Sequence, residues 1–141
     1  MQSLNNISAR QIAVSGLKAQ RTRMNLIANN IANAETTRTP QGGPFRRQMV
    51  ILRGEEIGIG GNMDKMGVRV KDVKADPSPF REVYDPSHPD ANGAGYVQYP
   101  NVQIAVEMAN LVSAQRAYEA NIAVMVSSSR MSEAAQEILR R

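Results

Sequence analysis

The positions of proline and glycine divide this chain into three zones and constrain its fold more than any other feature. All seven prolines lie between Pro40 and Pro100, and nine of the ten glycines lie between Gly42 and Gly95, with Gly16 as the exception. Because both residues disfavour helix interiors, the flanks can form long helices and the middle cannot. We expect a mainly α protein: an N-terminal helix within 1–38, a small β-rich insert and connector over 39–100, and a C-terminal helix within 101–141.

The C-terminal zone carries apolar residues at the spacing of a coiled-coil seam. From residue 104 to 125 the steps alternate between four and three, and only Gln115 breaks the apolar series, which is typical of a helix that packs lengthwise on another. The apolar members are Ile104, Met108, Leu111, Tyr118, Ile122 and Met125. We expect a helix from about 102 to 139, roughly 57 Å long, with Asn101 as N-cap. Part of so long an apolar face must meet other chains.

The N-terminal zone repeats this pattern. Apolar residues again recur at alternating steps of four and three, which predicts a helix from about residue 5 to 35 that pairs with the C-terminal one. The larger seam residues are Leu17, Met24, Ile27 and Ile31. The helix should end before Pro40, because β-branched residues and the residue before proline disfavour α conformation.

Three asparagines lie on one face of the N-terminal helix. Asn25, Asn29 and Asn33 are spaced four apart, so they share a face. They could form a solvated polar surface. They could instead donate hydrogen bonds to neighbouring helices and fix their register, as a buried asparagine does in coiled coils. We prefer the second interpretation, because solvent-facing helices usually carry Glu and Lys.

The middle zone changes to the alternating pattern of strands. Residues 45–52, 68–71 and 80–84 read as three strands of one small antiparallel unit. Residues 54–67 contain five glycines and predict a mobile loop or hairpin tip. Residues 85–93 combine prolines with Asn92-Gly93 and predict a turn-rich connector.

Composition argues against several classes of function. The chain has no cysteine and one histidine, which excludes disulfides and thiolate metal sites and leaves no typical zinc set. The net charge of +4 is scattered, whereas a nucleic-acid face shows a clustered stripe. His88 lies in a turn between prolines, where an exposed structural histidine is the ordinary case. We therefore expect no enzyme, no metal or other cofactor, no nucleic acid and no membrane insertion.

Three separated motifs resemble the bacterial flagellar rod and hook axial proteins. Residues 28–33 read Ala-Asn-Asn-Ile-Ala-Asn, which is similar to the N-terminal signature of that family. The Gly, aromatic and basic residues that usually follow are displaced to residues 42–47, which resembles a proximal-rod member. Residues 83–102 and 113–121 are similar to the same member. The three motifs occur in the family's order, and the match is weakest over 54–67.

The resemblance implies a structural subunit. In this family the terminal helices pair and stack into a hollow tube that transmits torque from rotor to hook. It implies self-association, with other proximal and distal rod proteins, the ring-to-rod adaptor and the flagellar type III export apparatus as partners. It also implies a periplasmic rod within the basal body, and export without a cleavable signal peptide. The seam residues would then pack within and between subunits, and Asn29, Asn33, Asn110 and Asn121 would set register.

Other interpretations remain open at this stage. The pI of about 9.8 is compatible with a nucleic-acid-binding coiled-coil dimer, although the arginines are scattered. An enzyme that uses His88 is another. A distal-rod or hook subunit is a third, although the short insert and the displaced 42–47 element argue against it.

Overall fold

Two long helices flank a small β insert in the sequence, as expected. The computed structural model describes residues 2–56 and 66–140, with the side chains of the first helix from Ala9 onward. The elements in chain order are α1 (Gln2–Ala32), β1 (Gln48–Glu56), β2 (Met66–Ala75), β3 (Arg81–Tyr84), β4 (Tyr96–Tyr99) and α2 (Ile104–Leu139). The mainly α fold with a small β insert is thereby confirmed.

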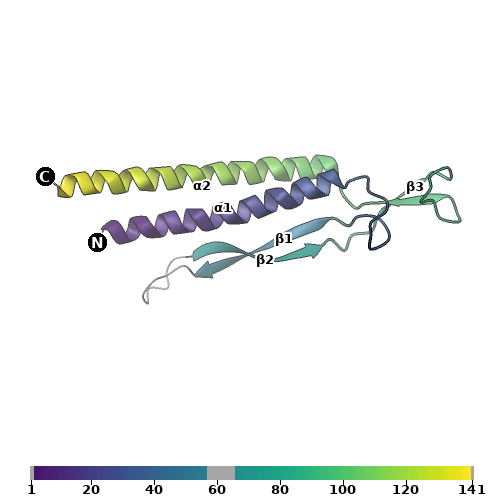
Figure 1. Cartoon of the computed structure of the whole chain (residues 1–141), viewed down its shortest axis with the longest axis horizontal. Coiled ribbons are helices and arrows are strands. Elements are labelled where there is room, and N and C mark those ends of the chain that lie inside the picture. The colour runs from purple at the N-terminus through teal and green to yellow at the C-terminus, as the bar shows by residue number, and fades with distance from the viewer. Residues whose placement is uncertain (1, 57–65, 141) are drawn as a thin grey trace.

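The two helices lie side by side and antiparallel, with both chain termini at the same end of the molecule (Figure 1). The 36 residues of α2 span roughly 54 Å. Its N-cap is Gln103, which makes no capping bond through its side chain. The expectation that Asn101 caps the helix is therefore wrong, because the Asn101 amide instead bonds the strand segment beside it.

The β insert forms two separate ribbons, so the expected single unit of three strands is wrong. β1 pairs with β2, and β3 pairs with β4, each antiparallel. The four-residue strand β4 was not predicted from the sequence, because it is short and follows directly on the turn at Asn92–Gly95. Of the expected loop at 54–67, the first and last residues belong to β1 and β2, and residues 57–65 lie outside the described part of the chain.

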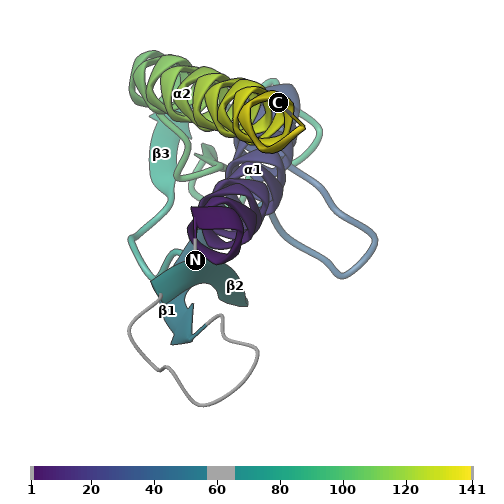
Figure 2. The same ribbon diagram turned by 90° about the vertical axis from the view of Figure 1, so that its left-hand side faces the viewer.

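The β1–β2 ribbon runs along α1 on the side away from α2 (Figure 2). Helix α1 contacts both strands as well as α2, so it is the middle layer of three. The Ser15 hydroxyl accepts a hydrogen bond from the Val68 backbone N–H at 3.0 Å, which joins α1 to β2. The β3–β4 ribbon projects beyond the ends of both helices (Figure 1).

The interior is built mainly from small side chains. Four alanines are buried where the elements meet, and the larger buried apolar side chains are Ile27 and Val97. The buried alanines are Ala13, Ala19, Ala34 and Ala114. A seam of small residues lets two helices approach closely but buries little apolar area. Since stabilisation scales with that area, the free subunit gains little from its own core.

Within residues 2–56 and 66–140, no helix combines the length and the apolar character needed to cross a membrane. The same residues contain no group of three acidic or histidine side chains placed to hold a metal ion. His88 is partly buried rather than exposed, and its Nδ1 accepts a hydrogen bond from the Asp90 backbone N–H at 3.1 Å. This contact gives the histidine a structural part in its turn.

Candidate assembly site

α2 turns one face toward α1, and only every second residue on that face belongs to the predicted seam. Its inward residues begin at Glu107 and continue at alternating steps of four and three. They are Glu107, Leu111, Ala114, Tyr118, Asn121, Met125, Ser128 and Ser132. Three predicted seam residues, Leu111, Tyr118 and Met125, belong to this series and are half-buried. The rest of the inward face is small or polar.

The other predicted seam residues of α2 point away from α1. Ile104, Met108 and Ile122 are 45%, 58% and 37% exposed, so they do not pack inside the helix pair of the free subunit, and their packing between subunits stays a prediction. The physical reason is that α2 has apolar residues on more than one side. A spacing of alternating four and three residues therefore fits more than one set of its apolar residues. On α1, Ile27 is buried, and Leu17, Met24 and Ile31 are half-buried.

The exposed large apolar residues of α2, apart from Leu139 at its end, form two strips. At 3.6 residues per turn, the strips lie on opposite sides of the inward face. The first strip is Ile104, Met108, Val112, Ile122 and Val126. The second strip is Val106, Val124, Met131 and Ile138. α2 is therefore apolar on three sides, which is the pattern of a helix surrounded by other elements.

The two helices come into close contact at Gly16, the single glycine outside the middle zone. A Cβ atom at Gly16 would lie 2.8 Å from both the Nδ2 and the Oδ1 atoms of Asn121. The Asn121 amide also donates to the Ala117 carbonyl of its own helix at 2.8 Å. Gly16 therefore makes room for an amide in the inter-helix contact, and the register role of Asn121 stays a prediction.

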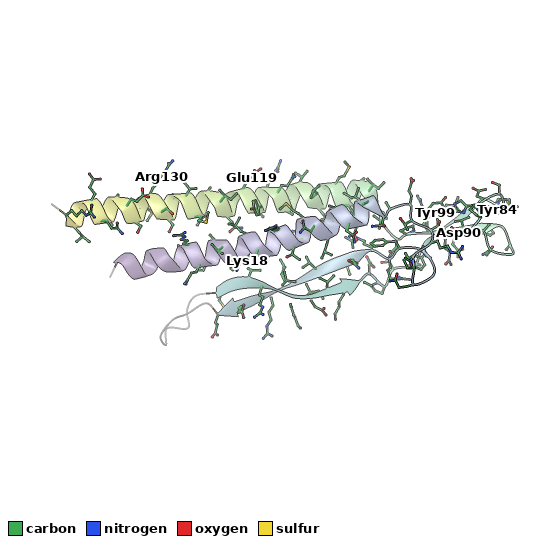
Figure 3. All side chains as sticks on the ribbon, viewed as in Figure 1. Lys18, Tyr84, Asp90, Tyr99, Glu119 and Arg130 are labelled. Atoms are coloured by element: carbon green, nitrogen blue, oxygen red, sulfur yellow. The ribbon has the colours of Figure 1, made fainter. Side chains whose placement is uncertain are left out.

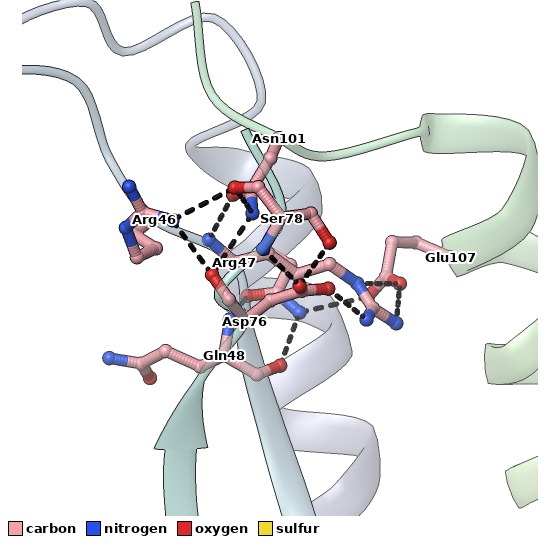
Figure 4. Close-up of polar contacts among 8 residues, drawn as sticks. Arg46, Arg47, Gln48, Asp76, Ser78, Asn101 and Glu107 are labelled. Carbon is pink, nitrogen blue, oxygen red and sulfur yellow. Dashed lines mark hydrogen bonds and ion pairs between the residues drawn. The ribbon is translucent and has the colours of Figure 1, made fainter. Parts of the chain in front are cut away.

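A buried polar cluster closes the end of the helix pair next to the β ribbons. We call Asn30, Arg47, Asp76, Asn101 and Glu107 the polar hub (Figure 4). Asn30 is 1% exposed. Its Oδ1 accepts from the Gln48 backbone N–H, and its Nδ2 donates to the Gln48 carbonyl, each at 2.9 Å. Asn30 thus pairs with the start of β1 as a neighbouring strand residue would.

Glu107 connects α2 to this cluster. Its side chain is 1% exposed, yet both carboxylate oxygens are bonded. Oε2 accepts from Asn30 Nδ2 at 2.9 Å, and Oε1 accepts from Arg47 Nε and Nη2 at 2.9 and 2.8 Å. A buried carboxylate is tolerated when it is paired and hydrogen-bonded in this way.

Arg47 and Asn101 extend the hub to the segments that precede β3 and α2. Arg47 Nη1 donates to Asp76 Oδ2 at 3.0 Å, and the Arg47 backbone N–H donates to Asn101 Oδ1 at 2.9 Å. The Asn101 amide donates to the carbonyls of Asp76 and Ser78 at 3.2 and 3.1 Å. The hub therefore fixes α1, β1, the segment after β2 and α2 relative to one another.

Ser78 and Arg47 hold the Asp76 carboxylate in its charged form. Ser78 donates its hydroxyl and its backbone N–H to Asp76 Oδ1, and with Arg47 these bonds lower the pKa of Asp76 from 3.8 to about 2. A carboxylate whose pKa is depressed by folding contributes stability above its unfolded pKa, and this stability is lost as the pH falls through the folded value.

A pH series on Asp76→Asn tests this. The free energy of unfolding of the wild-type chain should exceed that of Asp76→Asn by a constant amount from pH 7 to about pH 5, because an unfolded carboxyl titrates near 3.9. The difference should shrink between about pH 4 and pH 2. Urea denaturation across this range measures it. A difference that stays constant down to pH 2 would contradict the depressed pKa.

The asparagines named from the sequence do not form the hub. Asn25 and Asn29 are exposed, and Asn33, in the turn after α1, donates to the carbonyl and the Oδ1 of Asn29 at 2.9 and 3.1 Å. Asn110 is half-buried. Sequence reasoning missed Asn30, Arg47, Asp76 and Glu107. One available signal was Glu107, an acidic residue in the otherwise apolar first turn of α2.

Comparison with known proteins identifies relatives over most of the chain. Residues 11–38 match the family model described as flagella basal body rod protein, and residues 94–138 match the model of the C-terminal part of flagellar basal body rod proteins FlgEFG. The chain is 43% identical to the flagellar basal-body rod protein FlgC of Borreliella burgdorferi, over 94% of this chain and 97% of that protein. It is 43% identical to the FlgC of Bacillus subtilis, covering 90% and 93%. It is 40% identical to the FlgC of Salmonella typhimurium, covering 81% and 83%.

Proposed function

Because this chain belongs to the FlgC family of flagellar basal-body rod proteins, we propose that it polymerises through its terminal helices into the proximal rod. It is a structural rod subunit of the flagellar basal body and not an enzyme. In the proposed assembly, subunits stack into a hollow shaft that transmits torque from the rotor to the hook.

The observation that carries this proposal is the apolar character of α2 on three sides. One side is covered by α1, and the two strips on either side of it are exposed in the free subunit. A two-stranded coiled coil would cover one further side at most. The wall of a closed tube supplies a neighbour on each side of every subunit, and this arrangement matches two strips.

The composition of the helix pair supports assembly-dependent stability. The buried side chains of its internal contact include small ones such as Ala13, Ala114 and Ser128. The larger inward residues Leu111, Tyr118 and Met125 are only half-buried, and further large side chains lie in the exposed strips. Burying those strips between subunits would add about 1.5–3 kcal/mol for each fully buried large side chain. A subunit whose helices gain so much on assembly suits transport as an extended chain. We propose export by the flagellar type III apparatus without a cleavable signal peptide.

The proposed partners follow from the proposed place of this chain in the proximal rod. Copies of this chain would contact one another, the other proximal rod proteins, the distal rod and the ring-to-rod adaptor, within the periplasm. Asn25 and Asn29, which are exposed in the free subunit, would meet neighbouring subunits together with Ile104, Met108 and Ile122. Asn33, Asn110 and Asn121 would hold register closer to the helix pair.

Deletion of the gene tests the proposed function. Cells without it should not swim, and their purified basal bodies should contain rings but no complete rod by electron microscopy. The intact gene supplied in trans should restore both. Motile cells with complete rods would contradict a role in building the proximal rod.

A further inference from the structure

One dipeptide before β4 carries chemistry that the rod function does not use. Of the asparagines in the chain, only Asn92 is followed by glycine. The backbone nitrogen that follows an asparagine can attack its side-chain carbonyl carbon and expel ammonia, and glycine hinders this attack least because it has no Cβ atom. Asn92 and Gly93 are both exposed. They lie in the part of the molecule that projects beyond the helices, where Figure 3 labels Tyr84 and Asp90.

The turn holds the Asn92 side chain in a fixed position. Its Oδ1 accepts hydrogen bonds from the backbone N–H groups of Ala94 at 2.9 Å and Tyr96 at 3.0 Å. Since both partners are donors, they identify this atom as the oxygen of the carboxamide. The Asn92 backbone N–H donates to the Tyr96 carbonyl, and the Asn92 carbonyl accepts from the Gly95 N–H, each at 2.9 Å. These bonds fix both the backbone and the side chain of Asn92.

The bond from Ala94 folds the carboxamide back over the next peptide. The hydrogen-bonded ring that it closes contains both Cγ of Asn92 and the nitrogen of Gly93, so the two atoms that would form a new bond are held near each other. Within residues 2–56 and 66–140, neither the Gly93 N–H nor the Asn92 Nδ2 has a hydrogen-bond partner. A Cβ atom at Gly93 would meet nothing within 4 Å. The attacking nitrogen and the leaving amine are therefore both unrestrained.

The two bonds to Oδ1 lie where charge would develop. Attack of the Gly93 nitrogen on Cγ of Asn92 turns the carbonyl into a tetrahedral centre that carries its negative charge on Oδ1. Two backbone N–H groups directed at this oxygen, at 2.9 and 3.0 Å, are the arrangement of an oxyanion hole. In an unfolded chain, water would have to reorganise to supply the same stabilisation. The folded turn therefore lowers the barrier to attack.

We propose that Asn92 and Gly93 form a site of self-modification, at which the folded turn promotes deamidation of Asn92. The Gly93 nitrogen bonds to Cγ of Asn92 and gives its proton to a solvent base. The bond from Cγ to Nδ2 then breaks, and the amine takes a proton from solvent and leaves as ammonia. Water opens the resulting succinimide at either carbonyl to give aspartate or isoaspartate. No electron is transferred, and water is the co-reactant consumed.

The two products differ in their effect on the turn. An aspartate at residue 92 keeps an oxygen for the N–H groups of Ala94 and Tyr96, and its charge strengthens both bonds. An isoaspartate lengthens the main chain by one carbon, between the N–H that bonds Tyr96 and the carbonyl that bonds Gly95. These backbone bonds then no longer fit together, so we expect isoaspartate to loosen the turn that leads into β4.

Peptide mapping by mass spectrometry tests the site. The purified chain, incubated at pH 8 and 37 °C, should gain the mass of an amide-to-acid exchange at Asn92, and enzymatic methylation specific for isoaspartate should label the same peptide. The matched control is Gly93→Ala. Its Cβ atom fits the open space, and the φ of Gly93 is not positive, so this variant should fold as wild type and deamidate at least fivefold more slowly. Equal rates in the two chains, or no conversion at Asn92, would overturn the proposal.

A comparison of the folded and unfolded chains tests the part that the turn plays. The same incubation in enough urea to unfold the chain removes the hydrogen bonds to Oδ1 of Asn92 and leaves the dipeptide intact. The folded wild type should deamidate at least twofold faster than the unfolded chain. An equal or slower rate in the folded chain would contradict promotion by the turn. The reaction concerns the subunit alone, so this inference goes beyond the rod function and does not depend on it.

Discussion

Ile122→Asp is expected to abolish swimming while leaving the free subunit folded. Ile122 lies in the first strip of α2 and is 37% exposed in the free chain, so an aspartate there meets water and disturbs little of the subunit. In the proposed tube the same side chain would be buried against a neighbour. The assembly would lose about 1.5–3 kcal/mol of apolar burial per site and would have to desolvate a charge.

Three measurements separate folding from assembly for this variant. Circular dichroism and urea denaturation of the purified subunit should match the wild type, and soft-agar swimming should be lost. Ile122→Leu is the matched control and should swim. Leu111→Asp and Ile27→Asp, at inward positions, should abolish assembly and also destabilise the helix pair. Normal swimming by Ile122→Asp would remove the first strip from the assembly contacts.

Arg47→Ala should be the most destabilising single substitution in the polar hub. It removes both hydrogen bonds to Glu107 Oε1 and leaves a carboxylate that is 1% exposed without its cation. Removing one partner of a buried ion pair typically lowers the free energy of unfolding by about 3–5 kcal/mol. Urea denaturation of the purified chain near pH 7 measures this loss.

Two matched variants show whether the ion pair is responsible. Arg47→Lys keeps the charge but not the planar fork, and it should be intermediate. Arg47→Met with Glu107→Met removes both charges and should recover most of the loss, because a buried pair replaced by apolar residues is often nearly neutral. If Arg47→Ala stays within about 1 kcal/mol of wild type, it contradicts the importance assigned to the hub.

The helices could be predicted closely because their signals are local. The absence of proline from the flanks, their single glycine at Gly16 and the apolar periodicity place the helix ends within a few residues of Gln2–Ala32 and Ile104–Leu139. Local signals also found three of the four strands. The separation into two ribbons was missed because β4, the strand that pairs with β3, was not recognised, so β3 was assigned to the same unit as β1 and β2.

One sequence could not predict which element or subunit covers each set of apolar residues on α2. Ile104, Met108 and Ile122 carry a coiled-coil spacing as regular as that of the inward series, but they face outward. Periodicity reports that a face is apolar and does not report which element covers it. The inward face is hard to recognise because Ala114, Asn121 and Ser128 are small or polar.

The polar hub could not be predicted from the sequence for a related reason. Asn30 and Glu107 are 77 residues apart in the chain, and each alone resembles an ordinary surface residue. Burial and pairing give them their role, and both arise only when α1, β1 and α2 come together. Asn30 lies within the Ala-Asn-Asn-Ile-Ala-Asn motif, whereas the sequence reasoning chose Asn25, Asn29 and Asn33 because their spacing is regular.

Solvent accessibility of the two α2 strips before and after assembly tests the proposed rod wall most directly. Ile122→Cys and Val124→Cys place one thiol in each strip of a chain that otherwise has none. A maleimide should label both in the purified subunit, and neither should be labelled in intact basal bodies from motile cells. Equal labelling of either thiol in the free and assembled states would contradict the inference that α2 has neighbours on both sides.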